Sequence, residues 1–247
     1  MAGVTIEVVP TSAIAAPTWN EIWQLSDIFY ETDRDFVEES LKQHQRIVLF
    51  RSANERALIG MASVDLYPVE FRGRGLAVIF TSHVLLHERY RGHNLIQGIG
   101  LRTFLEARLR FPLRPIYWFF DTFSYKSYLL LPRNFREFWP RFERRTPEWE
   151  QALMDQLAAQ TYGAAWRPAQ SIVVRSGRKR LRPDTAPLGQ ALAAIPEVEF
   201  YARANPCHAE GDMLVCLCPL TVANWWSVAL RALRRSRKSS RAGDGEA

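Results

Sequence analysis

The segment with the clearest chemical potential begins at Arg89, after an apolar run over Ala77–Leu86 and before a helical pattern that starts at Leu95. The first N–H groups of a helix are unpaired and carry partial positive charge, so a strand-to-helix loop of this kind can bind phosphate groups. Gly92 lets the backbone approach such a ligand closely, and the two arginines attract it. We therefore expect a pyrophosphate site, with an ordinary strand-to-helix turn as the alternative. The residues expected there are Arg89, Tyr90, Arg91, Gly92, His93, Asn94 and Leu95.

The elements that would position this loop are predicted from hydrophobic periodicity and from turn residues. Their order is β-α-α-β-β-β-α-β-α. The expected ranges are a strand at Val4–Val9, helices at Pro17–Tyr30 and Asp33–Gln45, strands at Arg46–Arg51, Leu58–Tyr67 and Ala77–Leu86, a helix from Leu95 to Arg110, a strand at Ile116–Asp121 and a helix at Ser124–Leu131. Pro68–Gly75 contains two glycines and is expected to form a loop, and Pro132 is expected to stop the last helix.

Further elements are expected in the second half of the chain. They are a helix at Glu148–Gln160, a strand within Ser171–Arg175, a basic loop at Gly177–Pro187, strands at Glu199–Ala204 and Met213–Cys218, and a helix at Val222–Arg235. The expected organisation is a core over 1–140, an extension over 141–220 that completes or flanks the sheet, and an amphipathic helix with a basic, disordered tail over 221–247.

The loop and the element order together resemble the GCN5-related N-acetyltransferase (GNAT) superfamily. Its pyrophosphate motif, Gln/Arg-x-x-Gly-x-Gly/Ala, lies between the fourth strand and the third helix, and Arg89, Gly92 and Asn94 fall on its three defined positions. Asn94 departs from the last, small residue of the motif, although asparagine tolerates left-handed backbone geometry. The resemblance covers roughly residues 4–135. It implies a mixed α/β (α+β) fold with a mainly antiparallel twisted sheet flanked by helices, and the activity of an acyl-CoA-dependent acyltransferase.

The resemblance also implies where the reaction would take place. In such enzymes the thioester lies in the gap between the fourth and fifth strands, where a strand N–H stabilises the oxyanion. The backbone of Val84, Leu85 and Leu86 would then pair with the pantetheine arm of the co-substrate. Asp121 and His83 are the candidates for the base that deprotonates the amine. The alternatives are a helix cap near Ser124 for Asp121 and a hydrogen-bonded core residue for His83.

The general acid is expected on the helix after the fifth strand. The tyrosine position of the superfamily falls near Leu131 here, and Asn134-Phe135 stands in place of its Gly-Phe pair. Tyr128 is therefore the first candidate for the acid and Tyr125 the second, with packing as the alternative for both. Because the usual tyrosine is missing, a GNAT-shaped module that binds acyl-CoA without catalysis is an alternative function.

Aromatic side chains crowd residues 116–142. Core packing accounts for most of them, but a wide apolar wall would also suit a long acyl chain or a hydrophobic acceptor. Arg133, Arg136 and Arg141 interleave the rings and would meet an acidic acceptor or an acyl-carrier protein. The expected co-substrate is acetyl-CoA or a longer acyl-CoA, and the expected acceptor is a small-molecule or lipid-like amine.

The net charge of +6 is concentrated at the C-terminal end. Residues 231–247 hold six basic and two acidic side chains, which accounts for four of the six net positive charges. The rest of the chain is nearly balanced, so no nucleic-acid partner is expected, and a basic-tailed adaptor is disfavoured. The last helix carries Trp225 and Trp226, which predicts either binding to an anionic membrane or docking onto the protein.

Cysteine usage and hydropathy indicate the compartment. The three cysteines, Cys207, Cys216 and Cys218, do not suggest a disulfide framework, and the Cys-x-Cys pair fits a buried strand better than a zinc site, so no metal is expected. No apolar run reaches the roughly 20 residues that span a bilayer, and the first residues lack the basic start of a signal peptide. The sequence predicts a cytoplasmic protein, with peripheral membrane binding through the last helix as the alternative.

Overall fold

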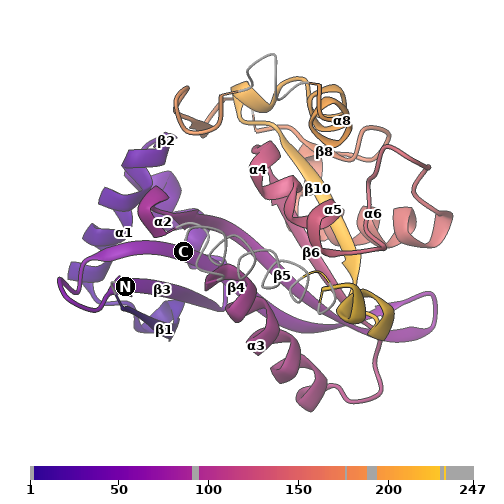
Figure 1. Cartoon of the computed structure of the whole chain (residues 1–247), viewed down its shortest axis with the longest axis horizontal. Coiled ribbons are helices and arrows are strands. Elements are labelled where there is room, and N and C mark those ends of the chain that lie inside the picture. The colour runs from indigo at the N-terminus through magenta and orange to yellow at the C-terminus, as the bar shows by residue number, and fades with distance from the viewer. Residues whose placement is uncertain (1–2, 91–94, 176, 188–193, 229–230, 232–247) are drawn as a thin grey trace, which may run out of the picture.

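The computed structural model describes residues 3–90, 95–175, 177–187, 194–228 and 231. Its centre is an eight-stranded sheet in the order β1-β3-β4-β5-β6-β10-β8-β7 (Figure 1). The strands are β1 (Val4–Pro10), β3 (Arg46–Ser52), β4 (Leu58–Phe71), β5 (Arg74–Leu86), β6 (Ile116–Thr122), β7 (Trp166–Arg167), β8 (Ile172–Val173) and β10 (Met213–Pro219). Neighbouring strands pair antiparallel except β5 and β6, which run parallel. The predicted mixed α/β class with a mainly antiparallel sheet is confirmed.

Helices cover both faces of this sheet. They are α1 (Ala16–Phe29), α2 (Arg34–Lys42), α3 (Leu95–Arg110), α4 (Tyr125–Tyr128), α5 (Leu130–Asn134), α6 (Glu148–Tyr162) and α8 (Pro196–Ala204). One core cluster joins α3, α4, α5 and α8 to the sheet, and two others join α6 and the α1–α2 pair to its opposite face. Side chains alternate across β6, so Trp118 and Phe120 belong to one face and Tyr117 and Phe119 to the other. Within the described residues, no helix is both long and apolar enough to cross a membrane.

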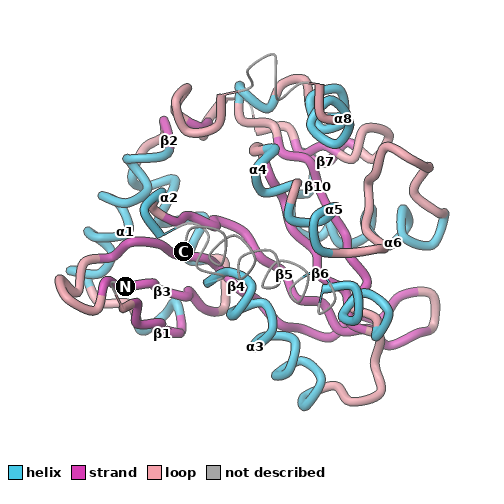
Figure 2. The backbone as a smooth tube through the Cα atoms, viewed as in Figure 1, coloured by secondary structure: helices cyan, strands magenta, loops and turns pink. Residues whose placement is uncertain are grey.

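A short two-stranded ladder joins distant parts of the chain. β2 (Tyr30–Glu31) follows α1 directly, and β9 (Arg180–Leu181) lies in the segment that was expected to be a basic loop. The two strands pair antiparallel, and Arg180 forms an ion pair with Glu31 at 2.5 Å. The ladder therefore holds residues from around position 180 against the end of α1, on the side of the molecule where β5 ends (Figure 2).

Two expectations about strands were wrong. Pro68–Gly75 is not a loop, because β4 and β5 continue into a hairpin whose two turn residues, Arg72 and Gly73, have φ of 47° and 73°. A two-residue turn of this hand suits the twist of paired strands, and Pro68 is tolerated because the β3–β4 pairing ends at Val64, which leaves β4 an edge strand there. The proposed strand Glu199–Ala204 lies inside helix α8.

The sequence explains α8 in retrospect. A proline stands in the first turn, acidic side chains follow it, and Val198 and Tyr201 are buried three residues apart on one face. The helix expected at Ser124–Leu131 is two short helices, and Pro132 lies inside the second rather than ending the first. A proline is tolerated there because the first turn of a helix makes no use of its N–H. The strand expected at Met213–Cys218 is β10 and pairs with β6.

Candidate functional site

The two parallel strands separate at their carboxyl ends. β5 and β6 pair from Ala77 and Ile116 as far as Thr81 and Phe120, and the pairing stops there. Thr122, at the end of β6, pairs with β10 on the other side instead. β5 continues to Leu86 in a different direction, so the sheet opens between the two strands (Figure 2).

A β-bulge turns β5 away at this point. Met61 pairs with Leu85 and Ser63 with Ser82, so His83 and Val84 together face one residue of β4. His83 has a φ of 51°, which is unusual for a residue with a side chain. Bulges bend a strand and re-aim its side chains, and they occur frequently beside functional sites. This bulge directs the segment after His83 away from β6 and thus widens the opening.

The opening leads into a cavity of about 400 Å³. It is bounded by the ends of β5 and β6, by α1 and α2, by the start of α3, by the α4–α5 region and by the helical residues 222–228. Most of its lining is apolar, and aromatic rings form a large part of it. These rings are Phe29, Tyr30, Phe36, Phe50, Tyr90, Trp118, Phe120, Phe123, Phe135 and Trp225. An apolar cavity with a few polar groups is the usual form of a small-molecule site.

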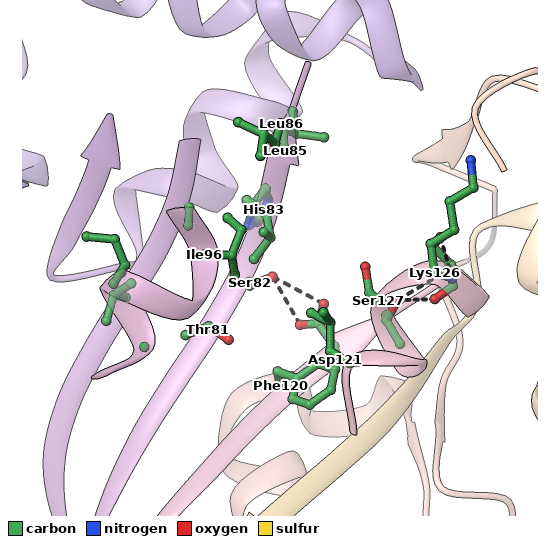
Figure 3. Close-up of a pocket in the computed structure, with 18 of the residues that line it drawn as sticks. Thr81, Ser82, His83, Leu85, Leu86, Ile96, Phe120, Asp121, Lys126 and Ser127 are labelled. Carbon is green, nitrogen blue, oxygen red and sulfur yellow. Dashed lines mark hydrogen bonds between the residues drawn. The ribbon is translucent and has the colours of Figure 1, made fainter. Parts of the chain in front are cut away.

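A carboxylate stands where the strands separate. The hydroxyl of Ser82, on β5, donates to both oxygens of Asp121, on β6, at 3.2 and 3.1 Å (Figure 3). The hydroxyl of Tyr162, at the end of α6, also donates to Asp121. Burial and the charge of Asp121 raise the pKa of Tyr162 well above its ordinary value, so Tyr162 stays protonated and remains a donor. Asp121 is therefore held in place from two sides.

A buried lysine reaches the same cavity from the segment before β9. Lys179 is 7% exposed, and its Nζ lies 4.0 Å from the ring centroid of Tyr30 and 5.7 Å from that of Phe123. Burial lowers the pKa of Lys179 from 10.5 to about 7, although the charge of Asp121 opposes this shift; Arg175 adds to it. Near neutral pH this amine therefore exists in both its charged and its neutral form.

His83 lines the cavity with a ring nitrogen that lacks a partner. Its Nδ1 is buried and makes no hydrogen bond within the described residues. Its ring lies 5.6 Å from that of His44, whose Nδ1 is 2.7 Å from Asp65 Oδ2. Burial lowers the pKa of His83 well below its ordinary value, and nearby positive charges, first that of Lys179, act in the same direction. His83 is accordingly a neutral imidazole.

The structure brings seven of the fourteen predicted site residues to the cavity. Those that line it are Asp121, His83, Val84, Leu85, Leu86, Tyr90 and Leu95. Arg89 is exposed in the turn Glu88–Tyr90 and is not part of the lining. Arg91, Gly92, His93 and Asn94, the middle of the expected phosphate-binding segment, lie outside the described residues.

The two tyrosines proposed as general acids do not reach the cavity. Tyr128 is fully buried, its hydroxyl donates to the carbonyl of Pro140 at 3.1 Å, and its ring packs against those of Phe138, Phe200 and Tyr201. Tyr125 is also buried and is not part of the lining. Both occupy the packing role that was the alternative for them, because the aromatic helix they belong to faces the core.

The cationic side chains of the cavity also differ from those expected. Arg133, Arg136 and Arg141 do not line it; Lys126, Arg175 and Lys179 do. Sequence reasoning missed Ser82, Tyr162, Arg175 and Lys179, since they come from β5, from α6 and from the segment between β8 and β9. Lys179 stands between two arginines in the chain, and nothing in that pattern distinguishes the buried residue from its exposed neighbours.

The C-terminal helical residues 222–228 dock onto the protein. Asn224 is fully buried, accepts from the backbone N–H of Arg136 and Glu137 at 2.9 Å each and donates to the carbonyl of Pro219 at 2.7 Å. The ring of Trp225 lies 4.5 Å from that of Phe104, and Trp225 also lines the cavity. Docking, one of the two alternatives for this helix, therefore holds for its described part.

The cysteines occupy ordinary positions. Cys216 and Cys218 are buried in β10, and Cys207 is partly exposed; none forms a disulfide. Burial raises the pKa of the two buried thiols well above the usual value, so they remain neutral. Within the described residues, no three His, Cys, Asp or Glu side chains are grouped so that they could hold a metal ion.

No protein-family model and no curated protein matches the chain. Among solved structures it is similar to a probable N-acyltransferase from Enterococcus faecalis, with a TM-score of 0.38 and 16% identity over 63% of this chain and 43% of the other, so it spans less than half of that protein. An acetyltransferase from Trypanosoma brucei is similar with a TM-score of 0.39 and 17% identity, over 59% of this chain and 99% of the other. A GNAT family N-acetyltransferase from Escherichia coli in complex with CoA is similar with a TM-score of 0.35 and 14% identity, over 49% of this chain and 63% of the other. These similarities are partial and concern the fold alone.

Proposed function

We propose that this chain is a GNAT-type N-acyltransferase, which moves an acyl group from a CoA thioester to an amine bound in the cavity between β5 and β6. The observation that carries the proposal is the separation of these two parallel strands beside Asp121. It exposes the edge of β5 after the bulge, next to a carboxylate and inside an apolar cavity. A thioester and an amine need such a shared space, because proximity and exclusion of water are what accelerate their reaction.

The co-substrate is proposed to lie along the separated edge of β5. The backbone of Val84–Leu86 pairs with the amide groups of the pantetheine arm, and Tyr90 and Leu95 mark where the chain leads into α3. The diphosphate is proposed to bind between these two residues, at the start of a 16-residue helix. This placement puts the thioester carbonyl near Ser82 and Asp121.

Residues of the chain are proposed to take up the proton that the acceptor amine loses. The acceptor amine attacks the thioester carbonyl carbon, the carbon–sulfur bond breaks, and the CoA thiolate leaves. Asp121 is proposed to take the proton that the amine loses, directly or through water, because it lines the cavity and is fixed by Ser82 and Tyr162. His83, neutral and with an unpartnered nitrogen, is the second candidate for this base. The leaving thiolate takes its proton from solvent.

Residues after position 140 are part of the proposed active unit. The extension contributes β10 to the sheet, the hydrogen bond of Tyr162 to Asp121, and the side chains of Arg175 and Lys179 to the cavity.

The apolar lining favours an acyl chain longer than acetyl or a hydrophobic acceptor, small-molecule or lipid-like. CoA is the favoured thioester carrier. An acyl-carrier protein is the alternative, because Arg133 and Arg136 are exposed outside the cavity lining and could meet its acidic surface.

The test is thiol release from acetyl-, octanoyl- and palmitoyl-CoA in the presence of a panel of amines. An N-acyltransferase releases thiol only when an acceptor amine is present and forms the matching amide, detected by mass spectrometry. Thermal stabilisation by acyl-CoA without thiol release would instead indicate a catalytically inactive binding module. The same measurement with purified acyl-carrier protein as the thioester carrier separates the two donors.

Peripheral membrane binding is a second candidate property of a cytoplasmic enzyme of this kind. Trp226 is 66% exposed and Val222 86% exposed on the docked helix, immediately before the basic residues. An exposed tryptophan beside basic residues suits an anionic membrane surface. Sedimentation with vesicles that contain phosphatidylserine tests it: Trp226→Ser should weaken binding of the full chain, and equal sedimentation with neutral vesicles would contradict it.

A further inference from the structure

Among the described residues that line the cavity, basic side chains outnumber acidic ones. Lys126, Arg175 and Lys179 line it, whereas Asp121 is the only acidic residue among its described lining. Lys126 donates to the carbonyl of Thr185 at 2.7 Å. Arg175 and Lys179 belong to none of the ion pairs found among the described residues.

The charge of Lys179 is costly to bury. Moving a cation out of water without a counter-ion is unfavourable, and Lys179 is 93% buried. The faces of Tyr30 and Phe123 compensate only in part. Asp121 is the acid whose charge acts on Lys179, but its oxygens already accept from Ser82 and Tyr162. A bound anion would supply the missing partner.

We propose that Arg175 and Lys179 bind the carboxylate of the acceptor, and that the acceptor is a hydrophobic α-amino acid. This inference rests on the proposed acyl transfer, and it names the substrate class of that site. The ammonium group of such a substrate faces Asp121, and its side chain lies against the aromatic wall that includes Tyr30, Phe36 and Phe123.

Three features of the cavity match the three parts of an amino acid. Asp121, Arg175 and Lys179 line the same cavity, so one negative and two positive groups face a shared space. The ammonium and carboxylate of an amino acid have the same arrangement on one carbon. The aromatic lining completes the match, because a charged or strongly polar side chain would lose its hydration there.

The arrangement separates the acceptor from the co-substrate. Arg175 and Lys179 lie between β8 and β9. β8 pairs with β7, and β9 pairs with β2, which follows α1. The expected diphosphate position lies at the start of α3 instead. Removal of a charge that binds the acceptor should therefore leave the affinity for CoA unchanged. Removal of a charge that binds the phosphates of CoA should lower it.

The experiment compares L-phenylalanine with L-phenylalaninamide, which keeps the amine and the ring but lacks the negative charge. Calorimetric titration of each into the CoA-bound protein should show phenylalanine binding roughly ten- to a hundredfold more tightly, as expected for charge-assisted hydrogen bonds. Lys179→Met and Arg175→Gln should each reduce this preference about tenfold or more. Their affinities for phenylalaninamide and for CoA should change less than about threefold.

The control is Arg180→Gln, which removes a positive charge one residue away, on an exposed side chain that pairs with Glu31. It should leave the preference intact. Lys179→Met nearly keeps the length of the side chain and removes a buried charge, so the variant should fold. Thermal melts check this. Arg175→Gln provides an independent variant. Equal affinity for the two compounds, no binding of phenylalanine, or an unchanged preference in both variants would overturn the inference.

Thiol release with octanoyl-CoA separates this inference from the proposed function. If phenylalanine binds with the predicted preference but no amine causes thiol release, the acyl transfer is contradicted and the carboxylate site stands. If phenylalaninamide is acylated as efficiently as phenylalanine, judged by kcat/KM, the acyl transfer stands and the amino-acid specificity is overturned.

Discussion

The hydroxyl of Ser82 bridges both carboxylate oxygens of Asp121, at 3.2 and 3.1 Å, across the point where β5 and β6 part. These are the first residues after the last paired positions, Thr81 and Phe120. The bridge closes the inner end of the opening and fixes the carboxylate at the cavity. A site where a parallel pair separates, beside a bulge, combines an exposed strand edge with an oriented acid–base group.

Replacement of Asp121 by asparagine tests its role as the base. The amide can still accept from Ser82 and Tyr162, so the fold and the thermal stability should change little. The loss of the proton acceptor should lower kcat about a hundredfold or more, while CoA affinity stays the same. Asp184→Asn, an exposed acid in the segment after β9, is the control and should keep full activity. Full activity of Asp121→Asn would shift the base to His83.

Tyr128→Phe tests whether the buried tyrosine is structural. The variant loses the hydrogen bond to the carbonyl of Pro140, which should cost about 1 kcal/mol of unfolding free energy and lower the Tm by roughly 2–4 °C. Its kcat should stay within about twofold of the wild type, since the hydroxyl does not reach the cavity. Tyr162→Phe, which removes a donor to Asp121, should by contrast lower activity. A hundredfold loss in Tyr128→Phe would restore the tyrosine as the general acid.

The burial of Lys179 predicts a pH dependence of stability. Its pKa falls from 10.5 to about 7 on folding, so between these values the unfolded chain binds a proton that the folded chain does not. The wild type therefore loses stability from this group as the pH falls from about 10.5 to about 7, and the loss levels off below that. The methionine variant lacks the group. Its unfolding free energy relative to the wild type should thus rise over the same fall in pH.

Urea denaturation of both proteins at pH 6, 7.5 and 9 measures this difference. Titrations of the other side chains cancel to first order, because the two proteins share them. A difference between the two unfolding free energies that does not vary with pH would show that Lys179 keeps an ordinary pKa in the folded protein.

Gly60→Ala tests the position of the β5 edge. A Cβ on Gly60 would lie 2.8 Å from the carbonyl oxygen of Leu85, so β5 would have to shift just beyond the bulge. We expect a loss of roughly 1–3 kcal/mol in unfolding free energy and weaker binding of CoA, measured by denaturation and calorimetry. Gly98→Ala, on α3, meets no atom within 4 Å and should instead stabilise the protein by about 0.5–1 kcal/mol. CoA affinity that is unchanged in Gly60→Ala would argue against pairing with this edge.

The sequence predicted the fold where its signals are local. Periodicity located the central strands and α3, and the apolar run at Ala77–Leu86 indicated the buried strand that carries the opening. It failed at Pro68–Gly75 and at Glu199–Ala204. In the first case strand pairing extended past a proline at an edge. In the second, a proline in the first turn and two buried positions on one face favoured a helix over the expected strand.

The site was predictable only in part, because its residues meet through the tertiary structure. Asp121 and His83 were predicted from the family resemblance, which put Asp121 at the exit of one strand and His83 within the other, and both line the cavity. The contribution of Lys179 depends on the pairing of β9 with β2, which no local pattern indicates. The inward direction of Tyr128 depends on how α4 packs against α8, and a helix of four residues has no periodicity from which its buried face could be read.

The central claim is that CoA binds along β5 with its thioester beside Asp121, and a crystal structure of the complex with acetyl-CoA tests it most directly. We predict pantetheine alongside Val84–Leu86, between the ends of β5 and β6, and the thioester sulfur next to the Ser82–Asp121 pair. Acetyl-CoA bound away from this opening, or an opening that stays closed to it at saturating concentration, would contradict the account.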